Sequence, residues 1–476
     1  MAGFERRLRL AWSSAVPLVP KHLELYRDHW LDCLSGGLTG TTYNELQRAI
    51  RRSELIVVSD YHPLERSRTG LADLIAEIPA TESVALVLEF LPLGTTLTAH
   101  EALRGCGPTL VTGQSLYEAY KPALEILAQR RGVIVGAWVD GSVGRRDEVA
   151  AQVWSRINRQ GRRRRCVMHF GDWHLAPEHL PARLASSGVE PLVIHQSPEP
   201  VWERLGANPN DRTFQTARGQ WVWLQTPPLS LWANLHQDLA DSDDELLTEA
   251  AEHLCESAAG LLASTFGLEP PSCRLSVLPA SCWSEFYDKL PPHRAAAFDR
   301  NHAPKLAVFH PRQPLAWSPR KLDLSDLIQG AAHSLICDSP LSMEVSFRGA
   351  LRRSSFRFLC AHLVNPFLRP AAPASLLEAM WPSPSAAQGN LGNQQQDWVK
   401  HQQTLLQACG RRRPEDVVGE YLPADMEVLL ERYWGQLAGS QLAQSEALDA
   451  VAVKEFLLLG NGVFDWGALT DTIRVA

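Results

Sequence analysis

Several common sequence signals are missing from this chain of 476 residues. It contains no uninterrupted apolar run of about 18 residues, which argues against a transmembrane helix. The nine cysteines are scattered, odd in number and never in Cys-x-x-Cys spacing. They therefore predict buried thiols in a reducing compartment instead of a disulfide framework or a zinc ribbon. No Gly-x-Ser-x-Gly elbow, P-loop or Gly-x-Gly-x-x-Gly turn follows a predicted strand, so the usual hydrolase, nucleotide and dinucleotide fingerprints are absent.

The chain also lacks an excess of positive charge. Its net charge is −7, with 21% charged and 45% hydrophobic residues, an ordinary balance for a globular protein. An acidic balance argues against a general nucleic-acid binder, so we read the run Arg162–Arg165 as a solvated turn before a strand. Residues 6–20 superficially resemble a signal peptide, but two serines and two prolines break the apolar part. We expect a cytoplasmic protein without a transmembrane segment or a nucleic-acid partner.

What the sequence does contain is an alternation of strands and helices between residues 42 and 226. Continuous apolar runs predict strands that are covered on both faces, and stripes of period 3.6 predict the intervening helices. The expected strands are 54–59, 83–90, 133–139, 166–170, 191–195 and 221–225. This order predicts an α/β fold with a mostly parallel sheet and helices on both faces.

Three regions follow from this pattern. Residues 1–41 are predicted to be a helical lead-in, 42–229 the α/β domain, and 230–476 a mainly helical domain of unknown role. A low-complexity stretch near 383–396 predicts a flexible loop. The helical half is also a candidate surface for a homodimer or for a protein partner.

Two predicted strands end in the same way, each with an Asp and a His two residues apart. Asp60 and His62 follow one strand, and Asp172 and His174 follow another. Because parallel strands all end at one edge of a sheet, these pairs could converge there with Glu89 and Asp140.

Such a mixture of carboxylates and imidazoles has two natural uses. One is a divalent-metal site with a polarised water, for which His62, Glu89 and His174 are the candidate ligands. The other is a metal-free acid/base site, in which Asp60, His62, Glu89 and His174 are the candidate catalytic residues. Structural roles stay open as well, since Asp60 could close a turn and Asp172 could cap a helix.

Two aromatic residues stand inside these pairs. Tyr61 lies between Asp60 and His62, and Trp173 lies between Asp172 and His174. Together with the two histidines they could flank a flat cofactor, although as core residues they need no ligand. His169, inside its strand, is interpreted as a buried histidine with hydrogen-bond partners.

The order of these motifs resembles the ChaN-like branch of the Tiki superfamily. Leu-Ile-Val-Val-Ser-Asp-Tyr-His at 55–62 is similar to that family's Gly-Glu-x-His strand end, and Val-Ala-Leu-Val-Leu-Glu-Phe at 84–90 to its Leu-Glu-Met-Phe strand. His-Phe-Gly-Asp-Trp-His-Leu-Ala-Pro at 169–177 is similar to its Gly-x-Gly-His-Leu strand end. The resemblance covers about residues 42–226. Two departures are Ser59-Asp60 in place of Gly-Glu, and Asp172 where the family has a small residue.

The resemblance implies a ligand site built from these strand ends. By position, Asp60 takes the place of the first motif's Glu, His62 of its His, Glu89 of the later Glu and His174 of the second His. The branch is associated with haem binding and iron uptake, and other branches include metal-dependent peptidases and erythromycin esterases. The hypotheses are therefore binding of haem or of a divalent metal, hydrolysis of the Tiki or erythromycin-esterase type, or a non-catalytic scaffold.

Overall fold

A computed structural model gives the structure of the protein. It describes residues 7, 8, 10–12, 21–61, 65–105, 107–159, 164–205, 212–239, 244–319, 322–344, 346–366, 368–371, 373–380 and 424–444. The chain forms two compact units: the α/β unit is residues 17–231, and the helical unit is residues 1–16 with 232–476. His62 and the predicted loop at 383–396 lie outside the described residues.

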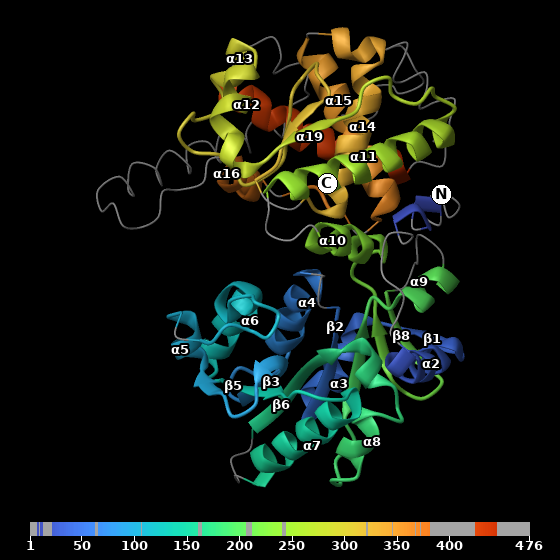
Figure 1. Cartoon of the computed structure of the whole chain (residues 1–476), viewed down its shortest axis with the longest axis vertical. Helices are drawn as coiled ribbons and strands as arrows, with labels where there is room; N and C mark the ends of the chain where they lie inside the picture. The colour runs from blue at the N-terminus through green and yellow to red at the C-terminus, as the bar shows by residue number, and fades with distance from the viewer. Residues whose placement is uncertain are drawn as a thin grey trace. The chain divides into compact units, whose positions relative to one another are not determined.

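The α/β unit alternates strands and helices, as the hydrophobic pattern predicts (Figure 1). Its strands are β1 (Leu38–Thr41), β2 (Leu55–Asp60), β3 (Ser83–Pro92), β4 (Thr96–Thr98), β5 (Val133–Trp138), β6 (Arg164–Gly171), β7 (Leu192–Gln196), β8 (Thr213–Thr216) and β9 (Trp221–Trp223). Its helices are α2 (Lys21–Ser35), α3 (Tyr43–Arg52), α4 (Glu65–Ala76), α5 (Ala99–Leu103), α6 (Leu116–Gln129), α7 (Val143–Arg159), the 3-10 helix η1 (Asp172–Leu175), α8 (Leu180–Ala185) and α9 (Glu199–Leu205).

The strands form one nine-stranded sheet in the order β1-β8-β9-β7-β2-β6-β3-β5-β4. The pairs among β9, β7, β2, β6, β3 and β5 are parallel. The edge strands β1 and β4 and the next-to-edge strand β8 form the antiparallel pairs, namely β1 with β8, β8 with β9 and β4 with β5. This confirms the predicted fold class and the six predicted strands. The unit begins before residue 42, because β1 in the expected lead-in extends the sheet.

Helices cover both faces of this sheet, and each face has its own apolar core. One core includes Val58, Leu86 and Leu88 with residues of α3, α4 and α6. The other includes Val57, Val87 and Phe170 with residues of α7 and α8. Burial on both faces explains why the strands are continuous apolar runs instead of alternating ones.

The helical unit contains a second, three-stranded sheet in the order β10-β12-β11. Its strands are β10 (Ser276–Leu278), β11 (Val308–Phe309) and β12 (Leu315–Trp317). Its helices are α11 (Asp244–Phe266), η2 (Ala280–Cys282), α12 (Trp283–Lys289), α13 (Pro292–Ala295), α14 (Leu324–Cys337), η3 (Pro340–Met343), α15 (Phe347–Val364), α16 (Pro373–Met380) and α19 (Ala424–Gln444), while α10 (Leu229–Leu239) spans the boundary at residue 231. None of the described helices is both long and apolar enough to cross a membrane.

Candidate functional site

The carboxyl ends of β2, β3, β6 and β7 lie next to one another in the sheet. Each of these strands delivers polar groups at or just after its last residues, as expected for the ligand-binding edge of an open α/β sheet. The groups are almost completely buried: Asp60, Glu89, Asp172, His174 and His195 are all at most 4% exposed. Burial at this level requires partners for every charged group.

Glu89 and His174 meet in one cluster, as predicted. His174, in η1 just after β6, places Nε2 3.3 Å from Oε1 of Glu89. Its Nδ1 lies 2.5 Å from Oδ1 of Asp147, a fully buried residue of α7. The two ring nitrogens of His174 are therefore each directed at a carboxylate.

Further contacts hold both carboxylates in place. The second Glu89 oxygen accepts a hydrogen bond of 2.8 Å from the Gly171 backbone N–H, and the first lies 3.3 Å from the Arg146 guanidinium. Arg146 is stacked over Trp138, 4.1 Å from the ring centroid. Tyr26 donates to the other oxygen of Asp147 at 2.8 Å. The cluster thus has defined geometry before any ligand arrives.

The electrostatics of His174 are set by these carboxylates. Burial alone would lower the pKa of the imidazole, but Glu89 and Asp147 outweigh it and raise the pKa to about 10. At neutral pH His174 is then an imidazolium, which is the wrong protonation state for a general base. Among the described residues, this cluster supports charge pairing or cation binding better than base catalysis by His174.

Asp60 belongs to a different cluster. It accepts a hydrogen bond of 3.0 Å from Ser67 of α4 and lies 3.8 Å from Nδ1 of His169. The Tyr120 hydroxyl of α6 is 3.1 Å from that same nitrogen. His169 is 1% exposed, and its hydrogen-bond partners are the Tyr120 hydroxyl at Nδ1 and the Ser67 hydroxyl, 3.5 Å from Nε2. This agrees with its interpretation as a buried histidine with hydrogen-bond partners.

The register of the sheet explains this separation. Val58, His169 and Leu88 are paired at one level across β2, β6 and β3. Asp60 comes two residues after Val58 and lies on the same face, whereas Glu89 comes one residue after Leu88 and lies on the opposite face. The structure therefore does not bring Asp60 together with Glu89 and His174, contrary to our expectation.

Asp172 anchors a third cluster. It accepts a hydrogen bond of 3.0 Å from the Tyr61 hydroxyl and lies 2.7 Å from Nδ1 of His195. On the far side of His195, Nε2 is 3.1 Å from the Gln220 side-chain oxygen, to which the Cys33 thiol also donates. Asp172 makes no side-chain cap, because the N-cap of η1 is Gly171.

The remaining candidates stand apart from the clusters. Trp173 is half-buried and Asp140 is exposed, so neither takes part in the Glu89–His174 cluster through a described contact. The role of Tyr61, His62, Trp173 and His174 around a flat cofactor stays a prediction.

The His195 pair predicts a pH-dependent stability. Burial alone would lower the pKa of His195, but Asp172 and then Cys33 outweigh it and raise the pKa from 6.5 to about 10. A raised pKa means that the folded state binds the proton more tightly, so this stabilisation is complete below pH 6.5 and is lost as the pH rises towards 10. In urea unfolding between pH 7 and 10, His195→Gln should lose less stability than the wild type, by on the order of 3 kcal/mol.

A matched control for this prediction is His302→Gln, because His302 has a 52% exposed side chain and pairs with Asp299 at the surface. That variant should keep the wild-type dependence on pH. His174 also has a raised pKa, so His195→Gln should still show part of the wild-type dependence of stability on pH. A slope in His195→Gln equal to that of the wild type would contradict the prediction.

Sequence reasoning missed two residues: Asp147, the carboxylate that contacts His174, and His195, the histidine that contacts Asp172. Both carried a signal. Asp147 stands on the apolar stripe of α7, three and seven residues before the buried Ala150 and Trp154. A carboxylate on a buried helical face calls for a partner. His195 ends a predicted strand in the same way as the other candidates.

Comparison with known proteins gives no assignment: no family model, no curated protein and no solved structure matches the chain. The resemblance to the ChaN-like branch is therefore based on the short motifs alone.

Proposed function

We propose that the α/β unit binds a divalent metal ion through Nε2 of His174 and the carboxylate of Glu89. The observation that supports this most directly is the 3.3 Å separation of these two atoms. Two ligands at about 2.0 Å from a tetrahedral ion such as Zn²⁺ are about 3.3 Å apart. The nitrogen and the oxygen thus stand at the spacing that a shared ion requires.

Asp147 supports the same proposal. A histidine ligand in a metal site commonly donates its second ring N–H to a carboxylate, which fixes the tautomer and directs the other nitrogen at the ion. The 2.5 Å contact between Asp147 and Nδ1 of His174 has this geometry. The ion replaces the proton on Nε2, so binding releases a proton at neutral pH.

The proposal needs at least one further ligand. Among the described residues, no three His, Cys, Asp or Glu side chains gather in a group that could hold a metal ion. We propose His62 or water as the additional ligand. The hydrogen bond from Tyr61 to Asp172 brings the end of β2, which precedes His62, towards η1.

A metal ion fits the described residues better than haem does. An axial histidine of haem presents one nitrogen to an open face on which the porphyrin lies. His174 instead directs Nε2 at Glu89, and its side chain is only 6% exposed. When bound, an ion at this position supplies Lewis-acid chemistry and activation of water, the basis of a hydrolase.

Metal analysis of the purified protein tests the proposal. We expect the wild type, after dialysis against Zn²⁺ or Mn²⁺, to retain about one equivalent and to release protons on titration of the metal-free form. Glu89→Gln and His174→Gln should lose stoichiometric binding. Asp147→Asn should bind roughly 10–100-fold more weakly, because it removes only the orienting carboxylate.

His169→Gln is the matched control, since His169 is an equally buried strand-end histidine on the opposite face of the sheet. It should keep the metal affinity of the wild type. A wild-type protein that retains no metal, or ligand variants that bind as the wild type does, would refute the proposal. His62→Gln decides whether His62 completes the site.

We further propose that the protein works in a reducing compartment such as the cytoplasm. All seven cysteines among the described residues are free thiols, and four of them are buried. Burial raises the pKa of the Cys166 thiol well above its ordinary value, which keeps that thiol unreactive.

A further inference from the structure

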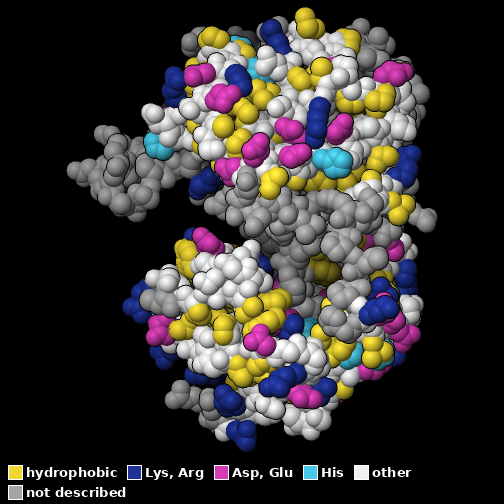
Figure 2. Space-filling view, in the orientation of Figure 1, with side chains coloured by type: hydrophobic (Ala, Val, Ile, Leu, Met, Phe, Trp, Pro, Cys, Tyr) yellow, Lys and Arg dark blue, Asp and Glu magenta, His cyan; other side chains and the backbone are white. Residues whose placement is uncertain are grey.

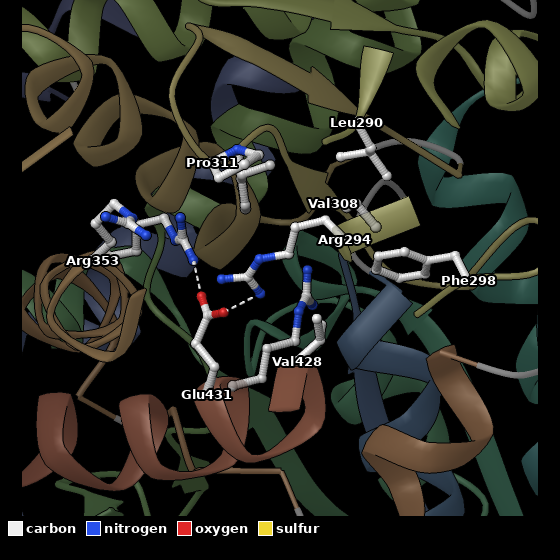
Figure 3. A pocket seen from close by; sticks show the side chains of 11 residues that line it. Leu290, Arg294, Phe298, Val308, Pro311, Arg353, Val428 and Glu431 are labelled. Carbon is white, nitrogen blue, oxygen red and sulfur yellow. Dashed lines mark ion pairs between the residues drawn. The ribbon is translucent and has the colours of Figure 1, made fainter. Parts of the chain in front are cut away.

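The helical unit contains a cavity that is lined by arginines (Figure 3). The cavity has a volume of about 30 Å³. Its charged lining residues are Arg294 of α13, Arg353 and Arg357 of α15, and Glu431 and Arg432 of α19. Apolar walls complete it, namely Leu290, Phe298, Val308, Phe309, Pro311 and Val428.

The lining has an excess of three positive charges, because four arginines face a single glutamate. Glu431 forms an ion pair with Arg294 and lies 3.8 Å from the guanidinium of Arg357. Dashed lines in Figure 3 mark the ion pairs of Glu431. The side chains of these three residues are only 8–11% exposed. Charges at this degree of burial are normally matched one to one.

The other two arginines bind only backbone oxygens. Arg353 donates to the carbonyls of Leu341 and Glu344, at 3.1 and 2.6 Å. Arg432 donates to the carbonyl of Ala307 at 2.7 Å. Neither forms an ion pair with a carboxylate of the described chain, so their charge is not neutralised there.

Nearby carboxylates do not restore the balance. Glu344 pairs with Arg352, an arginine that does not line the cavity, at 2.7 Å. Asp326 of α14 forms no ion pair with Arg432 among the described contacts and does not line the cavity, although its charge opposes the lowering of the Arg432 pKa by burial.

Besides burial, the excess positive charge also lowers the pKa values of Arg357 and His333, two cationic groups in or near the cavity. Burial and then the repulsion from Arg432, Arg353 and Arg294, opposed only by Glu431, lower the pKa of Arg357 to about 10. Burial and the field of Arg357 lower the pKa of His333 to about 3. The site destabilises cations and therefore favours an anion.

We propose that this cavity binds the phosphoryl group of a small phosphorylated molecule. Arginine guanidinium groups match the oxygens of a phosphate with two parallel hydrogen bonds, and a dianion neutralises most of the three excess charges. The cavity is too small for a whole nucleotide, so the remainder of the ligand lies outside it.

The surface of the molecule favours a small ligand over a polyanion. On the face shown in Figure 2, basic and acidic side chains are interspersed instead of gathered by sign. A nucleic acid needs a basic stripe that follows its backbone. The positive charge of this site is instead concentrated in one buried cavity.

Binding of defined anions to the full-length protein tests the proposal. The probes are inorganic phosphate and phenyl phosphate, compared at equal ionic strength with chloride and acetate. We expect both phosphates to raise the thermal unfolding midpoint in a saturable way, and chloride and acetate to have no such effect. A stronger effect of phenyl phosphate than of inorganic phosphate identifies an organic phosphate as the ligand.

Variants locate the binding site. Arg432→Gln should weaken phosphate binding at least about tenfold, whereas Arg353→Lys, which keeps the charge but loses the fork, should weaken it less. Arg348→Gln is the matched control, because Arg348 is exposed on the same helix α15 and is not part of the cavity. It should bind as the wild type does.

Two results would overturn the inference. One is an equal shift of the wild-type unfolding midpoint in phosphate and in chloride. This measurement uses the wild-type protein alone and does not depend on the folding of a variant. The other is a phosphate affinity that is equal in Arg432→Gln, Arg353→Lys and the wild type. A response to RNA that exceeds the response to both phosphates would also reject the small-molecule ligand.

Discussion

Glu431→Gln is expected to lower the free energy of unfolding by about 3–5 kcal/mol, the usual result of removing one partner from a buried ion pair. Burial alone would raise the pKa of Glu431, but Arg294 and Arg357 outweigh it and hold the carboxyl ionised. The amide leaves the arginines around it without any carboxylate among the residues that line the cavity. Urea unfolding in chloride buffer measures the loss.

The control for this variant is Glu427→Gln, one turn earlier on α19. Glu427 is only half-buried and does not line the cavity. Its neutralisation should change stability by no more than about 0.5 kcal/mol. Equal effects of the two substitutions would show that the ion pairs of Glu431 contribute nothing particular to stability.

Gly136→Ala is the second substitution with a large expected effect. A Cβ on Gly136 in β5 would lie 2.0 Å from the carbonyl oxygen of Pro92 and 2.7 Å from that of Leu91. These are backbone atoms at the irregular register between β3 and β5, and they cannot rotate away. We expect a loss of about 3 kcal/mol or more in the free energy of unfolding.

Gly260→Ala in α11 serves as the control, because nothing lies within 4 Å of the added methyl group. Alanine is favoured over glycine in a helix interior, so this variant should gain up to about 1 kcal/mol. If Gly136→Ala were as stable as the wild type, the prediction that β3 and β5 approach too closely for a side chain at this position would be contradicted.

Most of the fold could be predicted from the sequence because the local signals of the α/β unit agree with the structure that it forms. Its buried strands are apolar runs, and the helix α3 begins with a complete capping box at Thr42 and Glu45. Three short strands, β1, β4 and β8, were not predicted. They are edge or near-edge strands of three or four residues. Threonines in all three, and exposed positions in β1 and β4, leave them without an apolar signature.

The site was predictable only in part. The pairing of Glu89 with His174 follows from the rule that parallel strands end at one edge. The separation of Asp60 from Glu89 depends on the register of three strands, and a shift of one residue would reverse it. No local pattern specifies that register. The partners on α7 and β7, Asp147 and His195, carried a signal that becomes specific only once the helix and strand are placed on the sheet.

The position of β2 in the sheet has a consequence for how the chain is made. This strand is buried at all six positions, and its two neighbours, β6 and β7, begin at residues 164 and 192. A ribosome adds about 5–20 residues per second. On this timescale β2 waits roughly 5–20 s after its own synthesis before the first of its pairing strands has emerged. During that interval it is an unpaired apolar segment, the kind of sequence that chaperones recognise and that aggregates when they are absent.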